Sequence, residues 1–350
     1  MRHTPRFGDT IVLRPEEFRL LRDLFAARTG LHFGPEARFA LERRLRERLM
    51  VLKLSSFAEY YQCLRFGAGA AQEWDEAIDL LTTNETYFFR EDRQLRAFQN
   101  EILPMLSAQS ASRRRLAIWS AGCATGEEAY TIAIIVHRSN LFPRCDAALP
   151  RGCTERGDGT RDGAGHRSPT RFNRSGYEPS SANRAPSSNR MQVAAPCWDV
   201  RIYGTDLSRR CVAAARRGIY GESSFRVTPP ELRRAFFHEK GGAWHVSETI
   251  RQLCHFGQTN LLDDGRTLAL GKADVIFCRN VLIYFDATAR KAAIEGLYAC
   301  LNPGGVLLLG HSESLLNVST AFELVHLKDD LVYRKPLSAR EHGSTSDPYP

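Results

Sequence analysis

The residue types with the clearest chemical use lie in a short bend that follows an apolar run. Residues 116–119 (LAIW) are apolar, small residues predominate from 120 to 126, and a helix-like apolar periodicity resumes at Glu127. This order predicts a strand, a tight turn and a helix. In an open α/β sheet, such a turn forms one wall of a ligand crevice at the carboxyl end of the strand. The alternative is a strand-to-helix turn with only a structural role.

The composition of this bend restricts the class of ligand. Gly122 and Gly126 let the backbone approach a ligand closely, but no Lys-Ser/Thr pair follows, as a phosphate loop requires. Glu127 and Glu128 lie where they would repel a pyrophosphate. The bend therefore favours a nucleotide-like ligand without phosphates. S-adenosylmethionine, which carries a sulfonium and an ammonium, fits that description.

A carboxylate ends the next predicted strand, residues 200–203. Asp206 follows that strand in the sequence Gly-Thr-Asp. In dinucleotide folds an acidic side chain at this tip accepts hydrogen bonds from ribose hydroxyls, usually about 20 residues after the glycine bend. Here an intervening polar segment lengthens the spacing, and without that segment the spacing returns near the usual range. The alternative is that Asp206 only caps the helix that follows.

Two further strand ends carry polar side chains and are predicted to reach the same crevice. The residue pair 260–261 (Asn-Leu) follows one probable strand. The buried run 275–278 breaks into Arg279 and Asn280, with Tyr284 close behind. A continuous apolar strand is expected in a parallel sheet that is covered on both faces. These residues therefore belong to the candidate site.

The segment 81–92 (LTTNETYFFRED) joins the first helices to the predicted sheet. Its aromatic residues are expected to pack the two parts of the chain together, and the whole segment could serve only as a linker. Asn84, Thr86 and Arg90 carry hydrogen-bonding groups beside those aromatic residues, where one module joins the next. We therefore include these three side chains among the candidate site residues.

The overall composition excludes several protein classes. Hydrophobic residues make up 43% of the 350 residues, yet no apolar run approaches the ~20 residues that span a bilayer, and the N-terminal residues lack the apolar core of a secretion signal. The sequence therefore predicts a soluble cytoplasmic protein without membrane insertion. Nine scattered cysteines without a C-x-x-C pair predict reduced thiols and no metal site. The net charge of +8 favours an acidic partner, which could be nucleic acid, an anionic membrane or an acidic protein surface.

The pattern of apolar residues predicts three regions. Residues 1–82 form an all-helical domain, with helices expected near 18–29, 36–54, 56–64 and 74–81, and residues 83–336 form an α/β domain. The α/β domain contains a disordered insertion at 143–197, rich in Gly, Ser, Pro and Arg, and a small antiparallel β-subdomain at 220–256. The α/β domain is predicted to end with a helix over 286–301, a turn at 302–305, a strand at 306–310 and a hairpin. Residues 337–350 form a disordered polar tail.

The second predicted helix, 36–54, carries an apolar stripe and an excess of arginine on its other faces. A solvated helix face is one interpretation. A docking surface for an acidic helix is the other.

Five stretches taken together resemble one family. These are TTNETYFFRE, WSAGCATGEEAYTIAI, YGTDLS, FCRNVLIYF and LLGHSESL. They closely resemble the chemotaxis receptor glutamate O-methyltransferases, the CheR family, over nearly the whole chain to about residue 335 except the insertion. The resemblance implies a Rossmann-like S-adenosylmethionine-dependent methyltransferase domain, an all-α N-terminal domain and a small antiparallel β-subdomain. It implies methylation of glutamate carboxylates on acidic cytoplasmic helices of methyl-accepting chemotaxis receptors, for sensory adaptation.

The resemblance also assigns site residues. It implies cofactor contacts at Asn84, Thr86, Arg90, Glu128, Asp206, Asn260, Leu261, Arg279 and Asn280. It places Arg90 and Tyr284 near the transferred methyl group, which makes them the expected catalytic residues. A substrate glutamate has a reference pKa near ~4.3 and is already ionised at neutral pH, so no general base is required. Catalysis then depends mainly on alignment and desolvation.

The sequence departs from the family pattern in two places, and two other functions compete with the one implied. The insertion is not part of the pattern, and the turn in HEKGGAWHV looks shorter than in members that bind a C-terminal receptor peptide, so no such tether is expected.

The first competing function is that of a nucleic-acid methyltransferase, which the positive charge suggests. However, residues 279–282 replace the D/N-P-P-aromatic loop that is usual in such enzymes, and no nucleic-acid partner is predicted. A non-catalytic module that binds S-adenosylmethionine as a signal is the second alternative.

Overall fold

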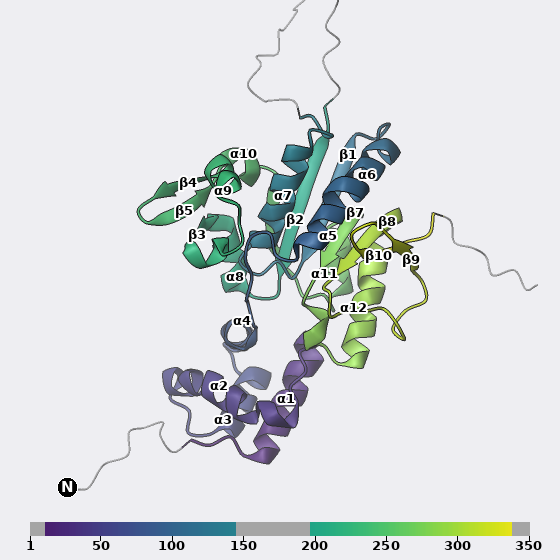
Figure 1. The fold of residues 1–350 in the computed structure, drawn as a ribbon. Helices are drawn as coiled ribbons and strands as arrows, with labels where there is room; N and C mark the ends of the chain where they lie inside the picture. Colours follow the sequence, from purple (N-terminus) through teal and green to yellow (C-terminus); the bar gives the residue numbers. More distant parts are fainter. Residues whose placement is uncertain (1–10, 145–196, 338–350) are drawn as a thin grey trace, which may run out of the picture.

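A computed structural model describes residues 11–144 and 197–337 of the chain. Except for their outermost residues, the predicted insertion (143–197) and the C-terminal tail (337–350) lie outside the described residues. A helical domain formed by the N-terminal residues packs below a larger α/β domain (Figure 1). Within the described ranges, no helix combines the length and apolarity needed to cross a membrane.

The N-terminal domain contains the four predicted helices. They are α1 (Pro15–Thr29), α2 (Arg38–Leu52), α3 (Phe57–Phe66) and α4 (Ala70–Leu81), with the short 3₁₀ helix η1 (Pro35–Ala37) before α2. α1 ends where Gly30 adopts a φ of 76° and donates its N–H to the Ala26 carbonyl. The fully buried side chains of Phe25, Leu45 and Tyr60 lie in a core separate from those of the larger domain.

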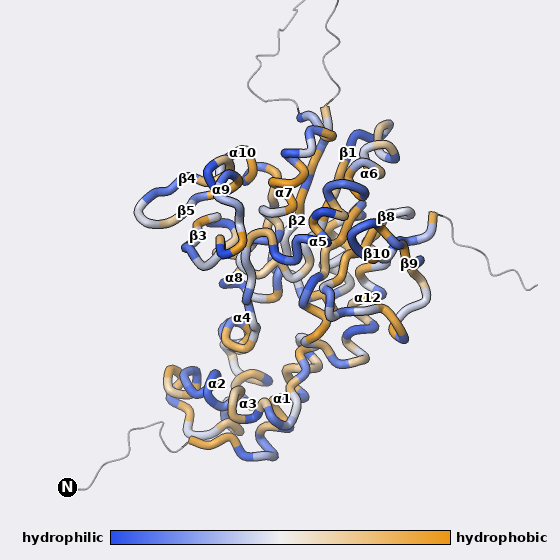
Figure 2. The backbone as a smooth tube through the Cα atoms, in the orientation of Figure 1, coloured by the Kyte–Doolittle hydropathy of each residue, from blue (hydrophilic) through white to orange (hydrophobic). Residues whose placement is uncertain are grey.

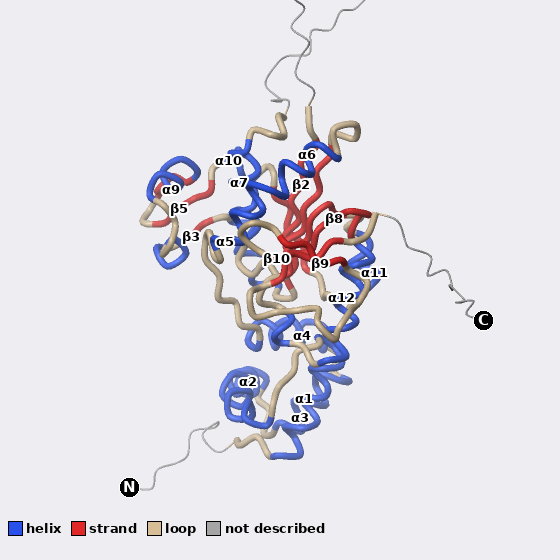
Figure 3. The backbone as a smooth tube through the Cα atoms, turned by 45° about the vertical axis from the view of Figure 1, so that its right-hand side comes forward, coloured by secondary structure: helices blue, strands red, loops and turns tan. Residues whose placement is uncertain are grey.

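The larger domain is organised around a mixed seven-stranded sheet. Its strand order is β6-β2-β1-β7-β8-β10-β9, and the first five strands of that order run parallel, whereas β10 runs antiparallel to β8 and β9. The strands are β1 (Arg115–Ala121), β2 (Asp199–Asp206), β6 (Cys254–Gln258), β7 (Ala273–Cys278), β8 (Leu301–Leu309), β9 (Glu323–His326) and β10 (Leu331–Arg334). Figure 3 shows these strands stacked between helices. The expected α/β class with a largely parallel sheet is confirmed.

Helices cover both faces of this sheet because alternate strand residues point to opposite sides. Val275 and Phe277 of β7 pack in a core with α7, whereas Ile276 and Cys278 pack in another with α12. The helices of this domain beside the sheet are α5 (Asp92–Ala97), η2 (Phe98–Ile102), α6 (Leu103–Gln109), α7 (Glu127–Ser139), α8 (Arg209–Arg217), α11 (Asp264–Ala269) and α12 (Ala287–Cys300). On the first face, α5, the π turn η2 and α6 follow one another without a break. Figure 2 shows the hydrophobic residues concentrated along the central strands and α7.

A second, three-stranded antiparallel sheet forms the predicted small subdomain. Its strands are β3 (Ile219–Tyr220), β4 (Phe237–Lys240) and β5 (Ala243–Val246), accompanied by η3 (Glu222–Phe225), α9 (Pro230–Phe236) and α10 (Glu248–Arg251). Gly241 and Gly242, both at positive φ, form the predicted β4–β5 turn. The predicted end of this subdomain at residue 256 is wrong, because β6 pairs in parallel with β2 of the main sheet.

Two other expectations are corrected. The predicted turn at 302–305 is a bulge inside β8 and not a connection before it, because the pairing with β7 passes from Leu301 opposite Ala273 directly to Val306 opposite Val275. Cys197 is disulfide-bonded, which corrects the expectation of reduced thiols at that position. A scattered set of cysteines gives no sign of which residues approach each other in space.

The segment between the two domains is anchored by one aromatic side chain. Phe88 is fully buried, and its ring centroid lies 4.8–5.0 Å from those of Tyr220, Phe225 and Phe237 in the small subdomain. Its N–H donates to the Ser224 carbonyl at 2.9 Å. Phe88 therefore anchors this segment to the α/β domain, and the expectation that it packs the two domains together is not met by this ring.

Truncation of this anchor should unfold the region around it. We predict that Phe88→Ala lowers the free energy of unfolding by ~3–5 kcal/mol, because a fully packed aromatic ring leaves a cavity. Denaturant titration measures this loss. Phe39→Ala is the matched control, because that ring is 68% exposed and its removal should change stability by less than ~0.5 kcal/mol. Equal effects of the two substitutions would contradict the anchoring role.

Candidate active site

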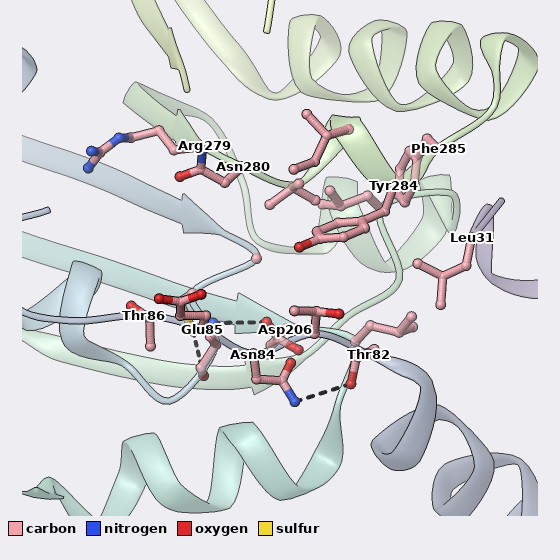
Figure 4. Close-up of a pocket in the computed structure, with 18 of the residues that line it drawn as sticks. Leu31, Thr82, Asn84, Glu85, Thr86, Asp206, Arg279, Asn280, Tyr284 and Phe285 are labelled. Carbon is pink, nitrogen blue, oxygen red and sulfur yellow. Dashed lines mark hydrogen bonds between the residues drawn. The ribbon is translucent and has the colours of Figure 1, made fainter. Parts of the chain in front are cut away.

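A cavity of about 330 Å³ lies at the carboxyl ends of β1, β2, β6 and β7. Figure 4 shows side chains from several elements converging on it. The structure brings together all ten residues that the sequence and the resemblance singled out, namely Asn84, Thr86, Arg90, Glu128, Asp206, Asn260, Leu261, Arg279, Asn280 and Tyr284. Parallel strands explain why the side chains at and after β2, β6 and β7 converge, since the carboxyl ends of these strands meet at one edge of the sheet.

The glycine bend after β1 forms one wall of the cavity. Gly122 has a φ of 80° and would clash with Val281 if it carried a side chain. The N–H groups of Gly122 and Cys123 both donate to the Thr205 carbonyl at 2.8 Å, which binds the bend to the end of β2. Gly126, at a φ of 98°, directly precedes α7. The bend is therefore a close-approach turn that only glycine permits at these positions.

Asp206 lies at the tip of β2 and is almost fully buried. Its Oδ2 accepts the Ala124 N–H at 2.9 Å, and its Oδ1 accepts the Ser208 N–H at 2.8 Å. Burial raises the pKa of this carboxyl above its ordinary value, although these backbone N–H groups oppose the shift. A carboxylate has about four acceptor positions, so ligand hydroxyls can still donate to it. The helix cap predicted as the alternative is instead provided by Ser208, whose Oγ accepts the Cys211 N–H.

Glu128 adds a second acidic group to the wall opposite β7. Its Oε1 accepts the Ser120 hydroxyl at 2.7 Å, and its Oε2 lies 3.3 Å from Nη1 of Arg279. Burial raises the pKa of Glu128, and the Arg279 charge only partly offsets this effect. A buried carboxylate with residual acceptor capacity suits a cationic ligand group.

Arg279 has a structural connection that sequence reasoning did not foresee. Its guanidinium points away from Tyr284 (Figure 4), lies 3.0 Å from Oε2 of Glu91 and donates to the Arg90 carbonyl at 2.6 Å. Burial would raise the pKa of Glu91, but Arg279 and His311 lower it overall. The Arg279 side chain thus holds Glu91, Glu128 and the Arg90 backbone together. Glu91 itself was not predicted as a site residue.

A carboxylate from the loop after β8 holds the loop that carries Asn280 and Tyr284. The Glu313 side chain accepts the N–H groups of Gly310 (2.7 Å), Asn280 (2.8 Å), Val281 (2.9 Å), Leu282 (2.7 Å) and Ile283 (3.3 Å). Asn280 has a φ of 58°, a conformation that asparagine tolerates better than most residues. The stretch LLGHSESL contains Glu313, yet no spacing in the sequence shows that its carboxylate reaches the neighbouring loop.

The segment from 82 to 90 forms another wall. The Asn84 amide donates to Oγ1 of Thr82 at 3.2 Å, and Nη1 of Arg90 donates to the Glu85 carbonyl at 3.0 Å. The Arg226 guanidinium from the small subdomain lies 3.8 Å from the centre of the Tyr87 ring and 2.8 Å from Oε1 of Glu85. The small subdomain therefore steadies this wall from outside.

The N-terminal domain closes the remaining side of the cavity, which the sequence did not predict. Residues 29 and 31–33 and Arg44 line it. Leu31 forms an isolated antiparallel bridge with Phe285, and the His32 N–H donates to the Tyr284 carbonyl at 2.8 Å. These residues carry no sequence signal, because they reach the site only through the packing of one domain against the other.

The polar groups that line the cavity match the chemistry of S-adenosylmethionine. The two buried carboxylates Glu128 and Asp206 suit its ammonium and its ribose hydroxyls, and the bend at Gly122 allows a ligand to lie against the backbone. No group of three or more His, Cys, Asp and Glu side chains arranged to hold a metal ion occurs in the described part of the chain.

Comparison with known proteins decides the family. A sequence model described as CheR methyltransferase, SAM binding domain, matches residues 84–146 and 174–330, and one described as CheR methyltransferase, all-alpha domain, matches residues 16–82. The chain belongs to the CheR methyltransferase family. This CheR protein is accordingly an S-adenosylmethionine-dependent methyltransferase, and residues 147–173, between the two matched segments, fall within the predicted insertion.

Relatives of this CheR protein extend over most of its length. Chemotaxis protein methyltransferase 2 of Vibrio cholerae is 32% identical over 327 residues, covering 93% of this chain and 95% of the relative. Chemotaxis protein methyltransferase 2 of Pseudomonas aeruginosa is 30% identical, covering 87% of this chain and 88% of the relative. Chemotaxis protein methyltransferase 1 of the same organism is 28% identical, covering 91% and 97%.

Cofactor affinity should depend on pH through the two buried acids. The pKa values of Asp206 and Glu128 are raised by burial, so both groups take up protons at a higher pH than their ordinary values of 3.8 and 4.5. Protonation removes the negative charge that favours a cationic ligand. Affinity for S-adenosylhomocysteine, measured by calorimetry, should therefore fall on acidification before pH 4.5 is reached. A profile that falls only between 3.8 and 4.5 would contradict the assignment.

Removal of the Glu313 carboxylate should release the loop after β7. We predict that Glu313→Ala destabilises the protein by ~1–3 kcal/mol, since several backbone N–H groups lose their acceptor, and weakens cofactor binding. Thermal unfolding and calorimetry measure the two effects. Glu295→Ala is the control, because that side chain is 66% exposed and should leave both unchanged. Normal affinity in a folded Glu313→Ala protein would refute the role.

Proposed function

We propose that this protein transfers a methyl group from S-adenosylmethionine to side-chain carboxylates of glutamates in the cytoplasmic helices of chemotaxis receptors, in sensory adaptation. Its relatives are chemotaxis protein methyltransferases, which supports this pathway. A receptor substrate on the inner side of the membrane implies that the protein works in the cytoplasm. The domains proposed for these tasks are 1–82 for the receptor and 83–336 for chemistry, with the β-subdomain beside the entrance.

One observation carries the proposal. The cavity combines buried acids on the walls formed by β1 and β2 with cationic and hydroxyl groups on other walls. Arg44, Arg90 and Tyr284 all line it, and the Tyr284 side chain is 36% exposed. Figure 4 shows the Tyr284 hydroxyl projecting into the space above Asp206 and Asn84. Such a site can bind a cationic methyl donor inside the cavity and admit an acidic side chain of the substrate from solvent.

We assign a separate chemical role to each of the two proposed catalytic residues, Arg90 and Tyr284. Glutamate is ionised at neutral pH, since its reference pKa is ~4.3, so no base has to remove a proton. When bound, S-adenosylmethionine supplies an electrophilic methyl group that passes to the carboxylate oxygen while the electron pair stays on sulfur. Tyr284 donates a hydrogen bond that orients the attacking oxygen. The Arg90 guanidinium supplies the positive charge that holds a carboxylate at the site.

The remaining site residues are proposed to hold the cofactor. Asp206 accepts hydrogen bonds from the ribose, and Glu128 faces the ammonium. The other proposed cofactor contacts are Asn84, Thr86, Arg90, Asn260, Leu261, Arg279 and Asn280. Because the Arg279 guanidinium is occupied by Glu91, Glu128 and the Arg90 carbonyl, its contribution is to fix Glu128 in place.

The receptor is proposed to dock on α2 beside the cavity. Several of the basic side chains counted from the sequence are used internally: Arg48 forms an ion pair with Glu73, Arg46 with Glu42, and Arg44 donates to the Leu81 carbonyl. Arg43 on this helix and Lys53 directly after its end remain exposed. Fewer basic side chains are therefore available to contact the receptor than the sequence suggests. The two-residue β4–β5 turn supports a mode of binding without a C-terminal receptor tether.

Methyl transfer to receptor glutamates can be tested directly. Incubation with labelled cofactor and receptor-containing membranes should yield protein-bound label that alkali releases as methanol. Label in RNA or DNA, or no transfer despite cofactor binding, would contradict the proposal.

Two substitutions test the catalytic residues in the same assay. Arg90→Ala should lower the rate by about 10²–10³, as for the loss of a positioned charge-stabilising donor, and Tyr284→Phe by about tenfold. Arg93→Ala, an exposed arginine three residues away, is the matched control and should retain full activity. Near-normal rates for Arg90→Ala would remove that residue from the chemistry.

A further inference from the structure

Three walls of the cavity are hydrogen-bonded to the N-terminal domain. The Tyr284 carbonyl accepts the His32 N–H at 2.8 Å, and the Asn260 amide donates to the Arg28 carbonyl at 2.7 Å. The third connection leads to Asp206 through a buried serine and an aspartate of α4. The helical domain thus contacts the ends of β2, β6 and β7 at once.

The aspartate is Asp79, whose side chain is only 3% exposed. Its Oδ1 accepts the Ser208 hydroxyl at 2.5 Å and the Arg210 N–H at 3.2 Å. Nε of Arg210 lies 3.7 Å from Oδ2. Asp79 therefore holds the start of α8 from the opposite domain, in a place from which water is largely excluded.

Ser208 transmits this contact to the cofactor-binding acid. It is fully buried, and its N–H donates to Oδ1 of Asp206 at 2.8 Å. Its Oγ also accepts the Cys211 N–H at 3.1 Å at the start of α8. The hydroxyl hydrogen is committed to Asp79, so the orientation of this serine and the position of its N–H depend on the aspartate.

The other ion pairs of the interface differ from this contact. Glu76 of the same helix lies 3.0 Å from Nη2 of Arg209 and 3.8 Å from Nη2 of Arg210, and these arginine side chains are 49% and 62% exposed. Solvent-exposed pairs contribute little to stability. Glu76 and Asp75 of this helix pair with exposed arginines of α8, and neither hydrogen-bonds to Ser208 or Asp206. Asp79 differs from both, because it is tied to the cavity through Ser208.

We propose that Asp79 is a positioning residue for the cofactor site, through which the N-terminal domain completes that site. This inference deepens the proposed function and rests on its assignment of Asp206 to the cofactor. By linkage, a ligand that is bound more tightly when the domains are docked must in turn favour the docked arrangement to the same extent. Cofactor binding and the orientation of the receptor-docking domain are therefore coupled.

The test compares the affinity for S-adenosylhomocysteine of matched variants by calorimetry. Asp79→Ala should raise Kd by about tenfold, equivalent to ~1.4 kcal/mol. Asp79→Asn keeps an oxygen that accepts from Ser208 and should recover most of that loss. Glu76→Gln, the matched control on the same helix, should change Kd less than about twofold. Thermal unfolding establishes that each variant is folded.

A double-mutant comparison separates positioning from general loosening of the interface. If Asp79 acts through the serine, Ser208→Ala combined with Asp79→Ala should bind no more weakly than the worse single variant. If Asp79→Ala does not fold, Ser208→Ala decides the question, because its Kd should rise about tenfold if the serine transmits the contact and should stay unchanged if it does not. Wild-type binding combined with an unchanged Kd for folded Asp79→Ala and for Ser208→Ala overturns this inference. Failure of the wild-type protein to bind S-adenosylhomocysteine overturns the proposed function instead.

Discussion

The desolvation of acidic side chains at one edge of the parallel sheet is the constraint on which the rest of this structure depends. Taking an ionised carboxylate out of water is costly unless hydrogen-bond donors or cations surround it. Asp206 receives two backbone N–H groups, Glu128 receives a hydroxyl and a guanidinium, and Glu313 receives five N–H groups. The positive φ angles of Gly122 and Asn280 accompany this arrangement of the donors.

The acidic side chains at and around the cavity are of two kinds, according to what their oxygens bind. Glu313 and Glu91 use their oxygens on the protein itself and so fix loops, whereas Asp206 and Glu128 retain acceptor capacity toward the cavity. Arg279 joins the two kinds, since its guanidinium lies between Glu91 and Glu128. A cationic ligand with hydroxyl groups matches what remains unsatisfied, which is why the site suits a methyl donor of the sulfonium type.

The fold was largely predictable because the apolar periodicity is strong. The run 275–278, the glycine bend after β1 and the helix end at Gly30 each follow from local chemistry, and each is observed. The prediction failed where local signals are misleading. Pro303 and the two glycines after it usually mark a turn between elements, but here they form a bulge within β8, where the register with β7 shifts. Likewise, the predicted end of the small subdomain at residue 256 falls inside β6, because its partner β2 is distant in sequence.

By itself, the sequence determined which residues end the parallel strands and therefore which side chains meet at the cavity, because strand direction and side-chain period follow from local pattern. It also determined the family, through five ordered motifs. Only the tertiary structure decided that Glu313 holds the loop after β7, that Arg279 faces Glu91, that His32 of the helical domain lines the cavity, and that Asp79 of the same domain binds Ser208. These contacts join residues far apart in the chain. They depend on how the domains and loops pack, which no spacing along the sequence encodes.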